Sequence, residues 1–288
     1  MNFIDLKNGD VLEEIKNIPS NSVDLILTDP PYNIARKREF KRGKTKKVSL
    51  DFGEWDYFDS WESYLDWCDL WLQECNRVLK KDGHLFIFQS KDTPLIPVIE
   101  KNNFEIRNIM VWAKSNPVPQ FQKISFLSAM EFGVWATKKG SLRKNQTFNF
   151  TLQKEMHNIQ YERLDELSRE ELVDVIKKVI DNNIINEDKN EMFIDENGIQ
   201  IYRSSVVMGK EKTIHPTQKP LSFTKKLIAT FTNENDVVLD LFCGSGTTAV
   251  AAKMLNRSAY GIEMNNEYYE LEKKRVNDVD WGISLEKE

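Results

Sequence analysis

The hydrophobic positions near the start of the chain alternate between strand-like and helix-like patterns. Residues 23–28 form a continuous apolar run between polar residues, which is typical of a buried strand. A helical pattern then covers residues 59–81, with Asp59 as its N-cap and a turn at Gly83 as its end. A second buried strand is expected at 84–88. Further strands are expected at 106–113 and 131–137.

The same alternation resumes at Pro220, after a polar segment at 141–212 in which only one amphipathic helix, near 164–181, is clear. The elements expected after Pro220 are a helix at 221–231, a strand at 237–242, a helix at 247–255, a strand at 258–262 and a helix at 267–276. Strands and helices that alternate on both sides of an insert predict an α/β fold. We expect one open, mostly parallel sheet with helices on both faces.

Composition restricts the setting in which such a protein works. No run approaches the roughly 20 apolar residues of a membrane span, and the amino terminus has no basic region followed by an apolar core, so neither a membrane span nor a signal peptide is expected. The three cysteines, Cys68, Cys75 and Cys243, are scattered, which indicates a reducing compartment. They also lack a metal-ligand spacing with any histidine. We therefore expect a cytoplasmic protein without a metal site.

The net charge of −5 hides one strongly basic segment. Eight of the twelve residues from 36 to 47 are Lys or Arg, and the rest of the chain is acidic overall. Such a segment is suited to bind nucleic-acid phosphates, and the alternative is a solvated, disordered loop. The eight cations are Arg36, Lys37, Arg38, Lys41, Arg42, Lys44, Lys46 and Lys47.

A glycine-containing turn follows the strand expected at 237–242. Residues 240–246 read Asp-Leu-Phe-Cys-Gly-Ser-Gly, and Glu263 ends the next expected strand, 17 residues after Gly246. Glycines at a strand tip let the backbone approach a ligand closely, and a carboxylate about 20 residues later is placed to bind ribose hydroxyls. The third glycine of the dinucleotide fingerprint is missing. The pattern therefore favours a nucleoside-type ligand over a pyrophosphate.

A rare tetrapeptide follows the first buried strand, where residues 29–32 read Asp-Pro-Pro-Tyr. The rigid prolines would hold a backbone carbonyl beside the Asp29 carboxylate, giving two acceptors for the two N–H donors of an exocyclic amino group. The ring of Tyr32 would provide a stacking face for a planar base. The alternative is a proline turn with a surface tyrosine.

With His-Pro-Thr-Gln-Lys-Pro at 215–220, these motifs resemble the β subgroup of the amino-methyltransferases of bacterial restriction-modification systems. In that subgroup the catalytic motif precedes the cofactor motif, and the target-recognition segment lies between them. The resemblance implies a Rossmann-like sheet with a circularly permuted motif order. It divides the chain into a catalytic half (1–140), a target-recognition insert (141–212) and a cofactor-binding half (213–288).

The resemblance also implies roles for single residues. Asp29, Pro30, Pro31 and Tyr32 are the expected catalytic residues. The turn at 242–246 would hold the methionine part of S-adenosylmethionine, Glu263 the ribose and Asp10 the adenine, although Asp10 also suits a helix cap. The expected cofactor-binding residues are Asp10, Asp29, His215, Thr217, Lys219, Phe242, Gly244, Ser245, Gly246, Thr247 and Glu263. Residues 215–220 also read as a proline-bounded helix start with Thr217 as a cap.

These residues suggest methyl transfer from S-adenosylmethionine to N6 of an adenine flipped out of double-stranded DNA. Asp29 and the Pro30 carbonyl would direct the nitrogen lone pair at the methyl group, and no metal is needed. Cytosine N4 presents the same two donors and is the first alternative. A protein-glutamine or RNA methyltransferase and a non-catalytic DNA-binding module are further alternatives. The target sequence, a homodimer and a cognate endonuclease are left open.

Overall fold

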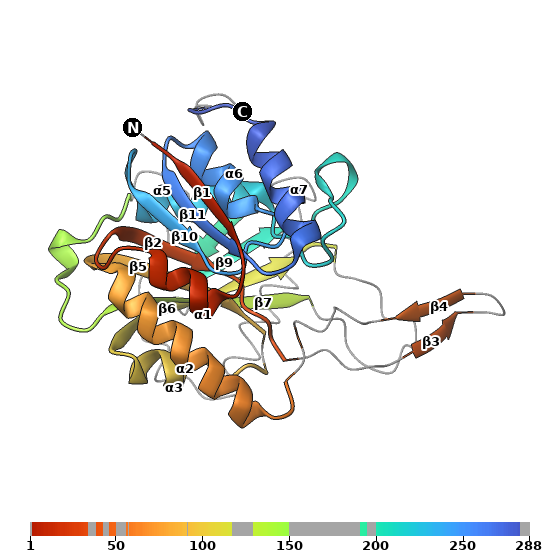
Figure 1. Ribbon diagram of the computed structural model, residues 1–288, viewed down its shortest axis with the longest axis horizontal. Coiled ribbons are helices and arrows are strands. Elements are labelled where there is room, and N and C mark those ends of the chain that lie inside the picture. Colours follow the sequence, from red (N-terminus) through yellow and green to blue (C-terminus); the bar gives the residue numbers. More distant parts are fainter. Residues whose placement is uncertain are drawn as a thin grey trace.

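The large sheet runs through the whole molecule. The computed structural model describes residues 2–33, 39–42, 46–49, 56, 58–90, 92–116, 129–149, 191–194 and 200–282. Within them nine strands form one sheet, in the order β1 (Ile4–Asn8), β11 (Ser258–Glu263), β10 (Val237–Asp240), β2 (Val23–Thr28), β5 (Leu79–Gln89), β7 (Met130–Lys138), β6 (Phe104–Lys114), β9 (Gln200–Ser204) and β8 (Glu191–Ile194) (Figure 1). Five of the eight strand pairs are parallel, which confirms the expected mostly parallel sheet.

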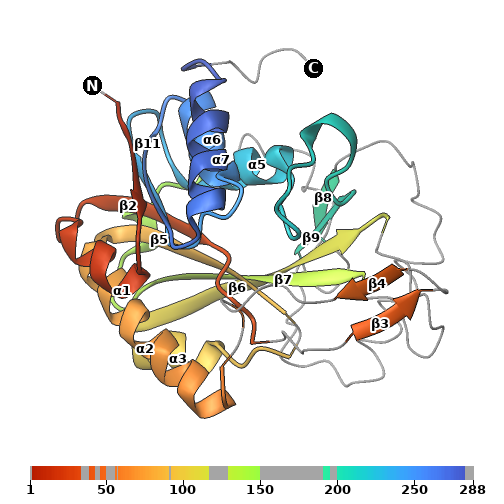
Figure 2. The ribbon, with the colours of Figure 1, turned by 45° about the vertical axis from the view of Figure 1, so that its right-hand side comes forward.

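Helices cover both faces of this sheet, as the alternating pattern predicts (Figure 2). One face carries α1 (Val11–Glu14), α2 (Trp61–Val78) and α3 (Ile96–Lys101), and the other carries α5 (Leu221–Phe231), α6 (Thr247–Met254) and α7 (Asn266–Asn277). Residues 25–27 of β2 show the reason, because their side chains alternate between the two cores. Ile26 is buried on the α2 side, and Leu25 and Leu27 are buried on the α5 side.

Both boundaries of the helix expected at 59–81 were wrong. Ser60, not Asp59, caps α2, because the Ser60 hydroxyl accepts the Ser63 amide at 3.0 Å while the Ser63 hydroxyl reaches back to residue 60. The helix ends at Val78, and Leu79 already pairs with β2, so Gly83 lies within β5 and not in a turn.

The strand expected at 237–242 ends at Asp240, two residues early. The Phe242 amide donates to Asp240 Oδ1 at 3.1 Å, and the Leu241 amide donates to Thr28 Oγ1 at 3.2 Å. Side chains therefore take the amides that would continue the strand, and the chain turns there. The helix expected at 221–231 has those bounds in the structure.

The described parts of the polar segment at 141–212 pack on the main body. Phe148 stacks on Trp135 with ring centroids 5.3 Å apart, and Asn149 Nδ2 donates to two carbonyls of residues 229 and 232 at 2.8 Å. Strand β9 pairs in parallel with β6 and so extends the large sheet. The helix expected near 164–181 lies outside the described residues.

A separate two-stranded sheet is formed by β3 (Glu39–Arg42) and β4 (Lys46–Ser49), which pair antiparallel (Figure 1). Four of the eight basic positions, Lys41, Arg42, Lys46 and Lys47, belong to these strands. The other four, Arg36, Lys37, Arg38 and Lys44, lie outside the described residues. In the part of the chain that the structure describes, no helix is long and apolar enough to cross a membrane.

Candidate active site

A hollow opens at the carboxyl ends of β2 and β10, the edge where open α/β sheets bind ligands. Its empty volume, counted with the open solvent at its mouth, is about 990 Å³. Most of the predicted site residues meet there. Those that line it are Asp29, Pro30, Pro31, Tyr32, His215, Thr217, Lys219, Phe242, Gly244, Ser245, Thr247 and Glu263.

The Asp-Pro-Pro-Tyr turn is fixed from behind by two residues that sequence reasoning missed. One carboxylate oxygen of Asp56 accepts the amides of Tyr32 and Asn33, at 2.6 and 2.8 Å. The Tyr64 hydroxyl, buried on α2, donates to the Pro31 carbonyl at 2.7 Å. These bonds set the direction of the turn, so the side chain of residue 29 faces the hollow.

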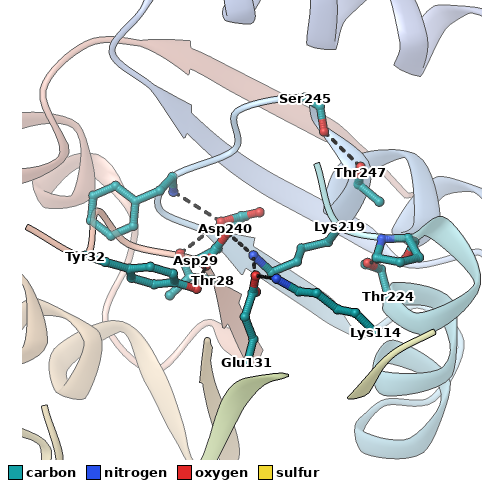
Figure 3. A network of polar contacts seen from close by, with 12 residues as sticks. Thr28, Asp29, Tyr32, Lys114, Glu131, Lys219, Thr224, Asp240, Ser245 and Thr247 are labelled. Carbon is teal, nitrogen blue, oxygen red and sulfur yellow. Dashed lines mark hydrogen bonds and ion pairs between the residues drawn. The ribbon is translucent and has the colours of Figure 1, made fainter. Parts of the chain in front are cut away.

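The two strand ends are joined at this edge by a hydrogen bond between buried side chains. Thr28 Oγ1 donates to Asp240 Oδ1 at 2.9 Å (Figure 3). Burial raises the pKa of Asp240 to about 6, although the hydrogen bonds from Thr248, Phe242 and Thr28 act in the opposite direction. The strand end that leads into residues 29–32 is therefore bonded directly to the end of β10, which lies more than 200 residues later in the sequence.

Gly244 forms the tip of the turn after β10 and adopts a left-handed φ of 53°. Its amide donates to Glu263 Oε2 at 2.7 Å, and Glu263 Oε1 accepts the Asn265 amide at the same distance. A Cβ at Gly244 would lie 2.6 Å from His215 Nε2, so only glycine lets this histidine close over the turn. Burial lowers the pKa of His215 to about 4, which leaves the ring neutral at neutral pH.

Gly246, expected to touch the cofactor, lies behind the hollow and does not line it. It precedes α6 with φ of 73°, and a Cβ there would lie 2.5 Å from Glu272 Cγ. Arg275 Nη1 donates to the Ser245 carbonyl at 2.5 Å. Gly246 therefore serves to let the turn pack against α7.

A chain of four alternating charges begins in the hollow with Asp29 and Lys219 and continues through Glu131 to Lys114, which do not line it (Figure 3). Lys219 Nζ pairs with Asp29 Oδ2 and, at 3.2 Å, with Glu131 Oε2. Lys114 Nζ pairs with Glu131 Oε1 at 2.5 Å. The Tyr32 hydroxyl donates to the remaining oxygen, Asp29 Oδ1. Both oxygens of the candidate catalytic carboxylate therefore accept a hydrogen bond from a neighbouring side chain.

The protonation of these groups follows from their burial and their partners. Burial raises the pKa of Asp29, and the Lys219 ammonium opposes this. Burial also acts to raise the pKa of Glu131, but Lys219 and Lys114 outweigh it and hold that pKa below its ordinary value. Burial acts to lower the pKa of Lys219, but the two carboxylates raise it overall. The pairing therefore favours the charged forms of Glu131 and Lys219, while burial works against the charged form of Asp29.

Aromatic rings surround the Lys219 ammonium. Its nitrogen lies 4.9 Å from the centroid of the Phe88 ring and 5.9 Å from the centroids of both Tyr32 and Trp112. At these distances the ring faces attract a cation. Trp112 belongs to β6, as does Lys114.

Asp10 does not line the hollow, and its carboxylate caps α1 by accepting the Leu12 amide at 2.8 Å. Its predicted contact with the cofactor therefore remains a proposal. Among the described residues, no group of three or more His, Cys, Asp or Glu side chains is placed to hold a metal.

Comparison with known proteins shows the family. The profile of a DNA methylase family whose members act on amino groups at N6 or N4 matches residues 23–274. The chain belongs to this DNA methylase family. It is 33% identical over 281 residues to the type II methyltransferase M.HinfI of Haemophilus influenzae, covering 94% of this chain and 67% of that protein.

Two solved structures share the fold. The complex of M1.HpyAVI with S-adenosylmethionine is 27% identical, with a TM-score of 0.60 over 96% of this chain and all of that one. The cytosine-N4-specific PvuII DNA methyltransferase is 19% identical, with a TM-score of 0.63 over 97% of this chain and 89% of that one. Both likenesses show the methylase fold of this family member.

Proposed function

We propose that this DNA methylase transfers a methyl group from S-adenosylmethionine to N6 of an adenine that is flipped out of duplex DNA. The observation that carries the proposal is the meeting of two motifs in one hollow. Asp29 and Tyr32, after β2, line the same hollow as Gly244, in the turn after β10, and Glu263, at the end of β11, whose carboxylate accepts the Gly244 amide. Residues 29–32 precede residues 240–246 in the chain, and this order resembles that of the permuted amino-methyltransferases.

The residues around Gly244 fit S-adenosylmethionine. Both Glu263 oxygens accept amides, yet each carboxylate oxygen has a further lone pair for a ribose hydroxyl. The Phe242 ring and the neutral His215 give the hollow apolar and uncharged surface. The donor bound in the M1.HpyAVI structure has the matching chemistry. When bound, this donor supplies an electrophilic methyl group on a sulfonium centre.

The residues of the turn act on the target amino group. Asp29 and the Pro30 carbonyl accept its two N–H bonds, which favours a pyramidal nitrogen whose lone pair faces the donor. The Asp29 carboxylate also stabilises the positive charge that develops on this nitrogen. Tyr32 stacks on the base, which leaves the duplex because its amino group is otherwise inaccessible.

The basic hairpin, formed by β3 and β4, is proposed to bind the DNA backbone. Its register places Lys41 opposite Lys47 and Arg42 opposite Lys46. The strand pair therefore brings basic positions of the sequence together, and a cluster of cations suits a phosphate backbone. Residues 141–212 are proposed to select the target sequence. A homodimer and a cognate endonuclease are compatible partners.

A salt titration tests the hairpin. If about five of the eight cations in residues 36–47 meet phosphates, changing all eight to Gln lowers the slope of log affinity against log salt by roughly 4 to 5. The matched control changes Lys16 and Lys273, which are exposed and distant in sequence from the hairpin, and leaves the slope unaltered. If the slope is unaltered in the eightfold variant, residues 36–47 do not bind phosphates and serve as a solvated linker instead.

The target base is decided by product analysis. Unmethylated genomic DNA is incubated with the enzyme and S-adenosylmethionine, digested to nucleosides and analysed by mass and retention. N6-methyladenine is the expected product. N4-methylcytosine as the main product would replace adenine and leave the Asp29 mechanism standing, since both amines present two donors. If the DNA stays unmodified while protein or RNA is methylated, DNA is not the substrate and the proposal is wrong.

A further inference from the structure

We propose that Lys219 holds the place of the target amino group in the free enzyme, and that Glu131, held by Lys114, keeps the Lys219 ammonium when the base arrives. This inference rests on the proposed function, because it concerns how the same site accepts its base. It assigns Lys219 to the base side of the hollow, whereas the sequence resemblance placed it on the cofactor side. It also gives Glu131 and Lys114 a role as positioning residues.

Both oxygens of Asp29 have a donor in the free enzyme, because Tyr32 donates to Oδ1 and Lys219 donates to Oδ2. Each oxygen keeps a second lone pair, so a target amino group competes with these donors for space and not for a lone pair. Lys219 and Asp29 both line the hollow from which the amino group must approach, so a donor on that side has to give way. Tyr32 is held by its backbone bond to Asp56, whereas Lys219 has a flexible stem. Lys219 is therefore the donor that moves.

The Lys219 ammonium lies in the space that a target base would need. Its nitrogen is within 6 Å of the ring centroids of Tyr32, Phe88 and Trp112. A base whose amino group bonds to Asp29 and whose ring stacks on Tyr32 needs the same space. The ammonium also resembles the positively charged nitrogen that methyl transfer produces, so a site that suits one suits the other.

When the Lys219 ammonium is displaced from Asp29, it keeps Glu131 as a partner. A buried lysine that leaves its only carboxylate would be strongly destabilised. Glu131 Oε2 already lies 3.2 Å from Lys219 Nζ. Glu131 belongs to β7, and Lys114 on the neighbouring strand β6 holds its other oxygen at 2.5 Å. Lys219 can thus move away from Asp29 while its positive charge stays paired with the Glu131 carboxylate.

The test follows the pH dependence of single-turnover methyl transfer to unmethylated genomic DNA, with cofactor affinity measured by calorimetry. The rate falls at low pH as Asp29 is protonated. The groups that face Asp29 are Lys219, Glu131, Tyr32, Tyr64 and Asp240. Of these, Lys219 lowers the pKa of Asp29 and Glu131 raises it. Removing each charge must therefore shift the acidic limb in opposite directions.

For Lys219→Met we expect the limb to move up by about one pH unit or more, because the buried carboxylate loses its cation. For Glu131→Gln we expect the limb to move down and the rate to fall about ten-fold or more, because Lys219 has no charged alternative to Asp29. Cofactor affinity should stay within about three-fold of the wild type in both. Lys16→Met, far from the hollow, is the control and should match the wild type.

Several outcomes would overturn the inference. A Lys219→Met variant with an unmoved limb, or with cofactor affinity reduced ten-fold, would return Lys219 to the cofactor side. If Lys219→Met does not fold, Glu131→Gln decides alone, and a wild-type rate and limb would refute the exchange. A wild-type enzyme that methylates no DNA base would instead count against the proposed function. Transfer to cytosine would leave the exchange standing.

Discussion

The two sides of the hollow are built in different ways. On the cofactor side, the turn after β10 is held by backbone amides, with Gly244 bonded to Glu263 only 19 residues away. On the base side, Lys219 bonds to Asp29 across 190 residues, through side chains alone. Glycine conformation and amide bonds fix one shape, whereas an ion pair can exchange partners.

This difference matches what each side has to do. In the proposed mechanism the donor binds a preformed turn, because a left-handed glycine and a carboxylate that is already bonded leave little to rearrange. The base is proposed to arrive from a duplex, and Lys219 fills its site before the base is there. Changes on the cofactor side should therefore abolish binding, and changes on the base side should alter rates and pH dependence.

The largest effect is expected for Gly246→Val. The left-handed φ costs about 1 to 2 kcal/mol for a residue with a Cβ, and overpacking against Glu272 adds about 1 to 3 kcal/mol. We expect affinity for S-adenosylmethionine, measured by calorimetry, to fall by about 100-fold or more. Gly140→Val is the matched control, since Gly140 has φ of 77° but a Cβ there would meet no atom within 4 Å. Normal affinity in Gly246→Val would show that the turn tolerates another shape.

A second test removes a buried acid behind the same turn. Glu272 on α7 is fully buried, and burial raises its pKa to about 8 from an ordinary 4.5. The folded state therefore binds this proton more tightly than the unfolded state. Its stabilising effect is complete below about pH 4.5 and is lost as the pH rises to about 8. The groups facing it are Cys243, Asp240, Glu263 and Arg275.

From pH 6 to pH 8 this one group should lower the free energy of unfolding by about 2 kcal/mol. Glu272→Gln cannot ionise and should lack that loss, as followed by urea unfolding at several pH values. Glu270→Gln, on the same helix but exposed, should keep the wild-type dependence. Parallel pH profiles for wild type and Glu272→Gln would mean that the carboxyl stays charged when folded.

The contrast between the two sides also explains what the sequence could predict. Long apolar runs such as 23–28 predicted the central strands, because burial on both faces leaves a strong pattern. Strand β1 and helix α3 were not predicted, since each is short and β1 has no fully buried residue. Boundaries near residues 60 and 79 were missed because a serine cap and long-range strand pairing decide them.

The candidate site divides in the same way. Short motifs predicted the turn residues around Gly244 and Asp29, since their partners lie nearby or follow a known spacing. Glu131 and Asp56 gave no signal, because their importance arises from contacts with Lys219 and Tyr32 that only the folded chain creates. The pairing of Lys114 with Glu131 becomes predictable only once β6 and β7 are known to be neighbours.

The smallest effects are expected at Tyr32, where two variants separate the ring from the hydroxyl. Tyr32→Ala removes the stacking face, which is worth roughly 1 to 3 kcal/mol per base, so kcat/KM should fall about ten-fold or more. Tyr32→Phe keeps the ring and removes only the hydrogen bond to Asp29. Because the stacking face stays in place, we expect a loss of only a few-fold.

Cofactor affinity should remain unchanged in both variants, because Tyr32 belongs to the base side. The order of the two effects is the decisive result. If Tyr32 stacks on the base, kcat/KM cannot fall further in Tyr32→Phe than in Tyr32→Ala. Equal losses of kcat/KM would mean that the hydroxyl accounts for the whole effect. Weaker cofactor binding in either variant would mean that the two sides of the hollow are not independent, and that exchange at the base also reshapes the turn at Gly244.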